Sequence, residues 1–231
     1  EITGELVYAL TAGNNLITFD SDLPEIVRTL TPVTGIAAGQ VLAGMDFRPA
    51  TGELYALGYN NTTGEARLYV IDDSTAVATA VGAAAITLEA GMNKIGFDFN
   101  PTVDRIRVTG SNNANYRLHP VTGAIAATDT DLAFAAADVN AAVNPSVGAV
   151  AYTNSYIGAT GTTLYNYEDS LNVLTTQVPP NNGTLNTLGS TGLTLSLTDP
   201  SADMYIYFDV ESGTNLAFLN ANTGGIADNF Y

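Results

Sequence analysis

The sequence has no cysteine, no tryptophan and one histidine, His119. The lack of cysteine excludes disulfides, thiolate metal sites and cysteine nucleophiles. A single histidine excludes a metal site built on a histidine pair, and the sequence contains neither a Gly-x-Ser-x-Gly elbow nor a glycine-rich phosphate loop. We therefore expect no enzymatic activity, with no catalytic and no cofactor-binding residues.

Positive charge is also scarce, because 7 Lys and Arg face 23 Asp and Glu, for a net charge of −16. A field of this sign repels nucleic acid and anionic lipid, so we expect neither as a partner. No apolar run approaches the roughly 18 residues that span a bilayer, which argues against membrane insertion. A cysteine-free, polar but weakly charged composition suits an exported protein, so we predict a secreted or cell-surface chain whose signal peptide has been removed.

The sequence contains internal repeats. Residues 44–49 (Gly-Met-Asp-Phe-Arg-Pro) recur as residues 96–101 (Gly-Phe-Asp-Phe-Asn-Pro), and degenerate copies begin at Gly148 and Leu195. A second unit, an alternating strand that runs into a polar turn, occurs five times. Its copies span residues 16–20, 68–72, 116–120, 164–168 and 217–221. Five copies at a period near 50 indicate five repeats.

Each repeat reads as a four-stranded antiparallel meander with apolar residues at alternate positions. A meander of this kind cannot bury both faces alone, and radial closure of several copies protects their edges. The sequence therefore predicts an all-β, five-bladed β-propeller in one domain; a β-sandwich or an open solenoid is the alternative. The predicted blades span residues 1–41, 42–91, 92–142, 143–192 and 193–231. The alanine-rich residues 131–142 are interpreted as the connection between the third and fourth blades.

The first blade is predicted to be incomplete. The Asp-Phe-x-Pro type of strand occurs four times, whereas the strand type that follows it occurs five times, beginning at Glu5. An unpaired strand edge can pair with another chain. We expect a neighbouring copy to complete or cover this blade and to propagate a filament or surface layer, with residues 1–4 and 229–231 as connectors. A loosely closed monomer is the alternative.

Asp46 and Asp98 occupy equivalent positions on predicted inner strands. Convergent carboxylates suit a hard cation or glycoside hydrolysis, so a glycan-binding or glycan-cleaving propeller is the alternative function. The later repeats carry Val150 and Leu197 instead of a third acid, and residues that recur in a repeat usually serve its architecture. We therefore interpret the motif residues as structural. They are Asp46, Pro49, Asp98, Pro101, Asp104 and Arg105.

Two acidic turns are the candidates for a metal ion. Asp72 and Asp73 lie in one turn, and Asp129 and Asp131 lie in another. Carboxylates with nearby carbonyls can supply the oxygen ligands that calcium takes, although neither turn has the spacing of a known calcium loop. Solvated loop acids are the alternative. Calcium is thus the only cofactor that the sequence suggests.

Residues 96–108 (Gly-Phe-Asp-Phe-Asn-Pro-Thr-Val-Asp-Arg-Ile-Arg-Val) and 115–123 (Asn-Tyr-Arg-Leu-His-Pro-Val-Thr-Gly) resemble the bacterial domain-of-unknown-function 4394 family. Further stretches also fit it, over residues 6–20, 44–57, 149–167 and 177–188. The resemblance implies exported proteins with a propeller-like domain and no known activity. Members of that family usually continue past the last Thr-Gly turn into a further strand that would belong to the first blade, and this sequence departs from that pattern. We expect an extracellular structural or adhesive module that binds copies of itself or surface glycans.

Overall fold

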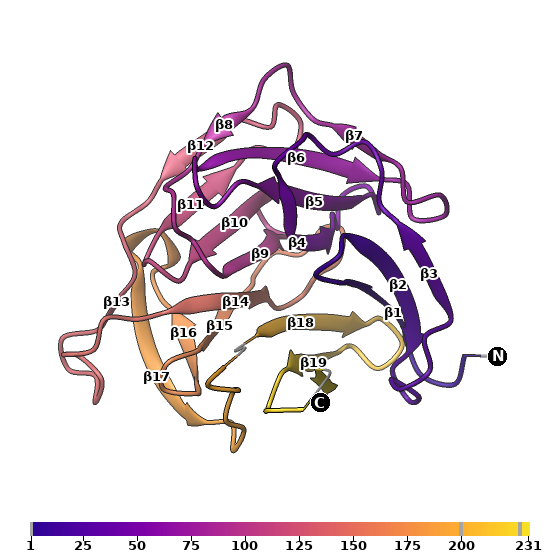
Figure 1. Cartoon of the computed structure of the whole chain (residues 1–231). Coiled ribbons are helices and arrows are strands. Elements are labelled where there is room, and N and C mark those ends of the chain that lie inside the picture. The colour runs from indigo at the N-terminus through magenta and orange to yellow at the C-terminus, as the bar shows by residue number, and fades with distance from the viewer. Residues whose placement is uncertain (1, 199–200, 226–227) are drawn as a thin grey trace.

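The computed structural model describes residues 2–198, 201–225 and 228–231. Five sheets, antiparallel except for one parallel pair in the fourth, surround a common axis, as Figure 1 shows. The one helical element among the described residues is the 3-10 turn η1 (Pro180–Asn182). The molecule is therefore a five-bladed β-propeller, as the repeats predicted.

The strands follow one another around the axis blade by blade (Figure 1). The first blade comprises β1 (Leu6–Leu10), β2 (Asn15–Asp20) and β3 (Thr29–Pro32). The second comprises β4 (Val41–Phe47), β5 (Leu54–Tyr59), β6 (Glu65–Ile71), β7 (Ala78–Ala80) and β8 (Ile86–Thr87), which pairs with β6. The third comprises β9 (Ile95–Asn100), β10 (Arg105–Gly110), β11 (Asn115–Leu118) and β12 (Ile125–Thr128).

Only the third blade has the predicted four strands, and the last two blades, like the first two, depart from this number in the described residues. The fourth comprises β14 (Val147–Tyr152), β15 (Leu164–Glu168), β16 (Val173–Gln177), β17 (Thr184–Ser190) and β13 (Ala133–Phe134). The fifth comprises β18 (Ala202–Asp209), β19 (Thr214–Ala221) and β20 (Asn229–Phe230). Strand β13 belongs to the predicted connection over residues 131–142 and pairs in parallel with β17. The connection thus adds an outer strand to the fourth blade.

The inner strand that the sequence predicted over residues 195–200 does not form where the structure describes it. Residues 195–198 are not in a strand, and Leu197, which stands at the repeat position of Asp46 and Asp98, is 97% exposed. Residues 199–200 lie outside the described residues. Strand β18 consequently packs directly against β14. The first and fifth blades are neighbours, and each has three strands among the described residues.

Most of the hydrophobic core lies between blades, and one further cluster lies within the fourth blade and the connection that precedes it. The largest cluster joins blades 2 and 3 through residues such as Tyr55, Leu57, Phe97 and Phe99, which are nearly inaccessible to solvent. Burying a side chain of this size contributes about 1.5–3 kcal/mol. Blade-to-blade packing is therefore the main source of stability.

The seam between the fifth and first blades is aromatic. Phe230 on β20 packs edge-on against Phe19 of β2 and stacks on Phe218 of β19, each with ring centroids 5.2 Å apart. The predicted connectors bond within their own blades. Backbone amides of Thr3 and Gly4 donate to Asp20, and Tyr231 exchanges backbone hydrogen bonds with Leu219. Thr3, Gly4 and residues 229–231 thus already bond within their own blades; residue 1 lies outside the described residues.

Two motif glycines allow the inner strands of successive blades to approach closely. A Cβ atom on Gly44 of β4 would overlap Cβ of Phe97 on β9, and one on Gly96 would overlap Val150 of β14 and Thr109. Because the neighbouring atoms are parts of packed strands, they cannot move aside without cost. These positions therefore require glycine, because a larger residue would overlap the neighbouring strand.

We expect Gly44→Ala to lower the free energy of unfolding by about 1–3 kcal/mol through overpacking of the β4–β9 contact. Urea denaturation followed by tyrosine fluorescence measures the change. Gly161→Ala is the matched control, because no atom lies within 4 Å of its added Cβ. Equal stability of the two variants would contradict the proposed spacing requirement.

Candidate functional site

Each of the two motif aspartates links the inner strand of its own blade to the inner strand of the next blade. Asp46 Oδ2 accepts a hydrogen bond of 2.8 Å from the amide of Phe99, and Asp98 Oδ2 accepts one of 2.8 Å from the amide of Tyr152. Each aspartate is only 3% exposed. The acids thus bind backbone in the following blade and not the arginines that lie near them in the sequence. Their burial leaves no open face on which they could reach a sugar ring.

The carboxyl groups of Asp46 and Asp98 also hydrogen-bond to each other. Such a bond requires one proton between the two groups. Burial raises the pKa of Asp46 to about 7, and burial together with the charge of Asp46 raises the pKa of Asp98 well above its usual range. The pair therefore keeps a proton at pH values at which an ordinary carboxyl group is ionised.

A third acid, Asp203 on β18, acts on this pair. Its charge raises the pKa of both Asp46 and Asp98, and the surrounding protein raises its own pKa to about 6 although its side chain contacts solvent. Tyr205, two residues further along β18, has its pKa raised by burial and by Asp46 and Asp98. Sequence reasoning missed Asp203 because it placed the inner strand of the fifth blade at residues 195–200.

The raised pKa values predict a dependence of stability on pH. The folded pair keeps protons that the unfolded chain releases above its ordinary carboxyl pKa of 3.8. The stabilisation is fully present below about pH 4 and is lost as the pH rises through about 7. Asp98→Asn keeps an acceptor for Tyr152 and a donor for Asp46 but removes one carboxyl group.

We expect the stability of Asp98→Asn relative to the wild type to increase from about pH 4 to about pH 7, measured by urea denaturation across that range. The control Glu211→Gln removes an acid from an exposed turn. A difference between Asp98→Asn and the wild type that does not change with pH would show that the pair carries no shared proton.

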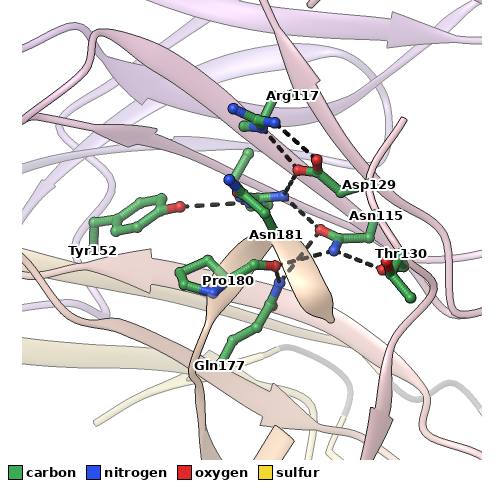
Figure 2. Close-up of polar contacts among 9 residues, drawn as sticks. Asn115, Arg117, Asp129, Thr130, Tyr152, Gln177, Pro180 and Asn181 are labelled. Atoms are coloured by element: carbon green, nitrogen blue, oxygen red, sulfur yellow. Dashed lines mark hydrogen bonds and ion pairs between the residues drawn. The ribbon is translucent and has the colours of Figure 1, made fainter. Parts of the chain in front are cut away.

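A second cluster, the arginine network, lies between blades 3 and 4 (Figure 2). Arg107 on β10 is 1% exposed, and its Nη1 donates to Asp129 Oδ2 at 2.6 Å and to Asn115 Oδ1 at 2.7 Å. Its Nη2 donates to Asn181 Oδ1 at 2.8 Å, and its Nε approaches the hydroxyl of Tyr152 at 3.4 Å. Arg107 thus contacts both blades.

Asp129 is held between two guanidinium groups. Besides its bond to Arg107, it accepts hydrogen bonds from Nε and Nη2 of Arg117 at 2.8 and 2.9 Å. Burial opposes ionisation of Asp129, but the two arginines outweigh it, so its pKa lies below the ordinary value. Gln177 of β16 extends the network by donating to Asn115 and to the carbonyl of Pro180 (Figure 2).

Removing the charge of Asp129 should leave Arg107 buried without a counter-ion. We expect Asp129→Asn to lower the free energy of unfolding by about 3–5 kcal/mol, the range typical of a broken buried ion pair. Thermal and urea denaturation measure the loss. Asp131→Asn removes an exposed acid two residues away and should have little effect. A small loss in Asp129→Asn would show that solvent compensates Arg107.

The four acids considered for calcium do not converge. Asp72 Oδ1 accepts hydrogen bonds from Ser74 and Thr75, which close its own turn and lower its pKa to about 2. Asp72 and Asp73 follow β6 in blade 2, whereas Asp129 and Asp131 lie between β12 and β13. No group of three or more His, Cys, Asp or Glu residues is placed to hold a metal ion in the described ranges. Calcium binding stays a prediction without an assembled site.

The other motif residues link adjacent turns. Arg48 donates from Nε and Nη2 to the two carboxylate oxygens of Asp104, at 2.8 and 2.5 Å, across blades 2 and 3. Arg105 donates from Nη1 to the carbonyls of Val103 and Asp104. Pro49 and Pro101 follow the inner strands β4 and β9, at the turns into β5 and β10. His119 Nδ1 accepts a hydrogen bond from the Val121 amide in another turn.

The radial sheets and the interlocked inner strands define a propeller that is built from repeats. The model of the family described as "Domain of unknown function (DUF4394)" matches residues 15–231, so the chain belongs to this family. No curated protein matches the chain. No helix in the described part of the chain is long and apolar enough to cross a membrane.

Several solved structures are similar to the chain. The glutaminyl cyclase of Myxococcus xanthus is similar, with a TM-score of 0.56 at 10% identity over 93% of this chain and 80% of that one. The Dos1 propeller aligns over 98% of this chain and 50% of its own, with a TM-score of 0.43 at 12% identity. At these identities the similarity to the cyclase supports the fold alone.

Proposed function

We propose that the chain is an extracellular structural or adhesive module that associates with copies of itself through its first blade and catalyses no reaction. The observation that carries the proposal is the pair of free edges of this blade. In the described part of the chain, β1 and β3 each pair only with β2. Free strand edges present unpaired backbone groups to which another chain can add.

Exposed apolar side chains adjoin the outer edge. Ile26, Val27 and Leu30 are 54%, 51% and 60% exposed, and Leu23 is also exposed. They lie in one stretch of chain that leads into β3 and forms part of it. Several exposed apolar side chains beside an open strand edge favour an association site. The first blade therefore combines both features that a protein partner needs.

A second copy is the simplest occupant. Antiparallel pairing of two β3 strands would place the same apolar stretch on both sides of a two-fold axis, as an isologous interface requires. Pairing of β3 with the outer edge of another blade would instead be head-to-tail and would propagate into a filament. Light scattering and electron microscopy distinguish the two arrangements.

The net charge of −16 must oppose such an assembly at low ionic strength. Salt screens repulsion between exposed charges, so association through apolar groups and backbone hydrogen bonds should strengthen as salt is added. Extracellular placement is supported by the composition, with no cysteine and few charged residues.

We expect the wild type to show a concentration-dependent increase in mass by size-exclusion light scattering, larger at high salt. Leu30→Lys places a charge on the outer edge and should return the protein to a monomer. Val139→Lys is the matched control, because Val139 is 89% exposed and lies between blades 3 and 4. A wild type that stays monomeric at every salt concentration would refute self-association.

A further inference from the structure

The face of blade 3 that meets blade 4 breaks the repeat. The strand registers pair Asp46 with Tyr55 in blade 2 and Asp98 with Arg107 in blade 3, so Arg107 occupies the position of Tyr55. In the same way Arg117 occupies the position of Val70 on the neighbouring strand.

Two further exchanges follow from the same registers. Thr109 and Asn115 stand where blade 2 has Leu57 and Leu68. Four apolar positions of one blade are thus polar in the next. Architecture alone does not require this, because the contact between blades 2 and 3 is built from the apolar version. Departures from local repeat rules are expected where a protein has a function to serve.

A cavity of about 380 Å³ opens at this interface. We call it the arginine cavity. Its lining includes Arg105, Arg107, Arg117, Tyr152, Asn100 and Asn181. Three of the 7 Lys and Arg residues of the chain line this one space. Asp129 offsets one of the three positive charges, and Asp104 nearby is paired with Arg48. A positive excess therefore remains in a strongly acidic protein.

The unused polar groups of the cavity are hydrogen-bond donors. Arg105 uses Nη1 for backbone carbonyls, and its Nε and Nη2 have no hydrogen-bond partner in the described residues. Arg107 donates a hydrogen bond to Oδ1 of Asn181, so the Nδ2 group of Asn181 remains available as a donor. The hydroxyl of Tyr152 lies opposite Arg107 Nε, which can only donate, so its own hydrogen is available. Donors of this kind match a ligand group that only accepts, such as a carboxylate.

We propose that the arginine cavity binds a carboxylate-bearing sugar residue, of the uronic acid class. A planar carboxylate fits the two adjacent donors on one side of a guanidinium group, here Nε and Nη2 of Arg105. The amides of Asn100 and Asn181 offer polar partners for hydroxyl groups. The volume lies in the range of sites for small ligands. This site is separate from the proposed association surface on blade 1.

Calorimetric titration of the full chain with galacturonate, galactose and acetate tests the proposal. We expect galacturonate to bind, galactose and acetate to bind at least about tenfold more weakly, and salt to reduce the affinity for galacturonate. Galactose that binds as well as galacturonate would refute the role of the carboxylate. Acetate that binds as well would refute the sugar, and lack of galacturonate binding would refute the site.

Two variants locate the binding. Arg105→Gln removes the free donors while leaving the Arg107 network intact, and it should weaken binding of galacturonate by about tenfold or more. Asn181→Asp keeps an acceptor for Arg107 but adds a negative charge to the cavity, and it should abolish binding. Arg67→Gln in blade 2 is the control for net charge. Equal losses in Arg67→Gln and Arg105→Gln, or unchanged binding in Arg105→Gln, would overturn the assignment.

Discussion

The inner strands of blades 2, 3 and 4 are joined by a glycine and an aspartate two residues apart. The glycine removes the side chain that would hold neighbouring strands apart, and the aspartate then accepts a backbone amide from the strand that has come close. Both residues face the following blade, so the Gly-x-Asp motif acts in one direction around the axis. The rest of the interface, with its buried aromatic and aliphatic side chains, packs at the spacing that this contact sets.

The same contact has an electrostatic cost. Two successive aspartates bring two carboxyl groups together in a buried environment, where both cannot be ionised. The chain avoids this by keeping a proton between them. The motif ends at β14, where Val150 replaces the acid, and β14 contacts β18 through an apolar cluster that includes Ala149, Ala151 and Ile206. At this interface apolar packing thus takes the place of the aspartate contact.

The sequence predicted the number of blades because the repeat period and the alternation of apolar residues can both be read directly along the chain. It could not predict which backbone amide Asp46 would accept, because the register between strands of different blades is not encoded locally. Residues 195–198 were expected to form an inner strand from their alternating leucines, yet they form no strand, and Asp203 on β18 is the acid that acts on the aspartate pair. The arginine network was also missed, although aligning the repeats would have shown Arg107 in place of Tyr55.

The presence of Arg107 at the repeat position of Tyr55 changes the chemistry of the interface between blades 3 and 4. A buried guanidinium group needs partners from several elements, and Arg107 draws on Asp129, Asn115 and Asn181 to satisfy it. Apolar residues of similar volume would usually give an equal or more stable interface. The interface between blades 2 and 3 is of this apolar kind. Because stability does not explain the polar version, the donors that remain unpaired beside Arg107 are best understood as groups whose acceptor comes from outside the chain.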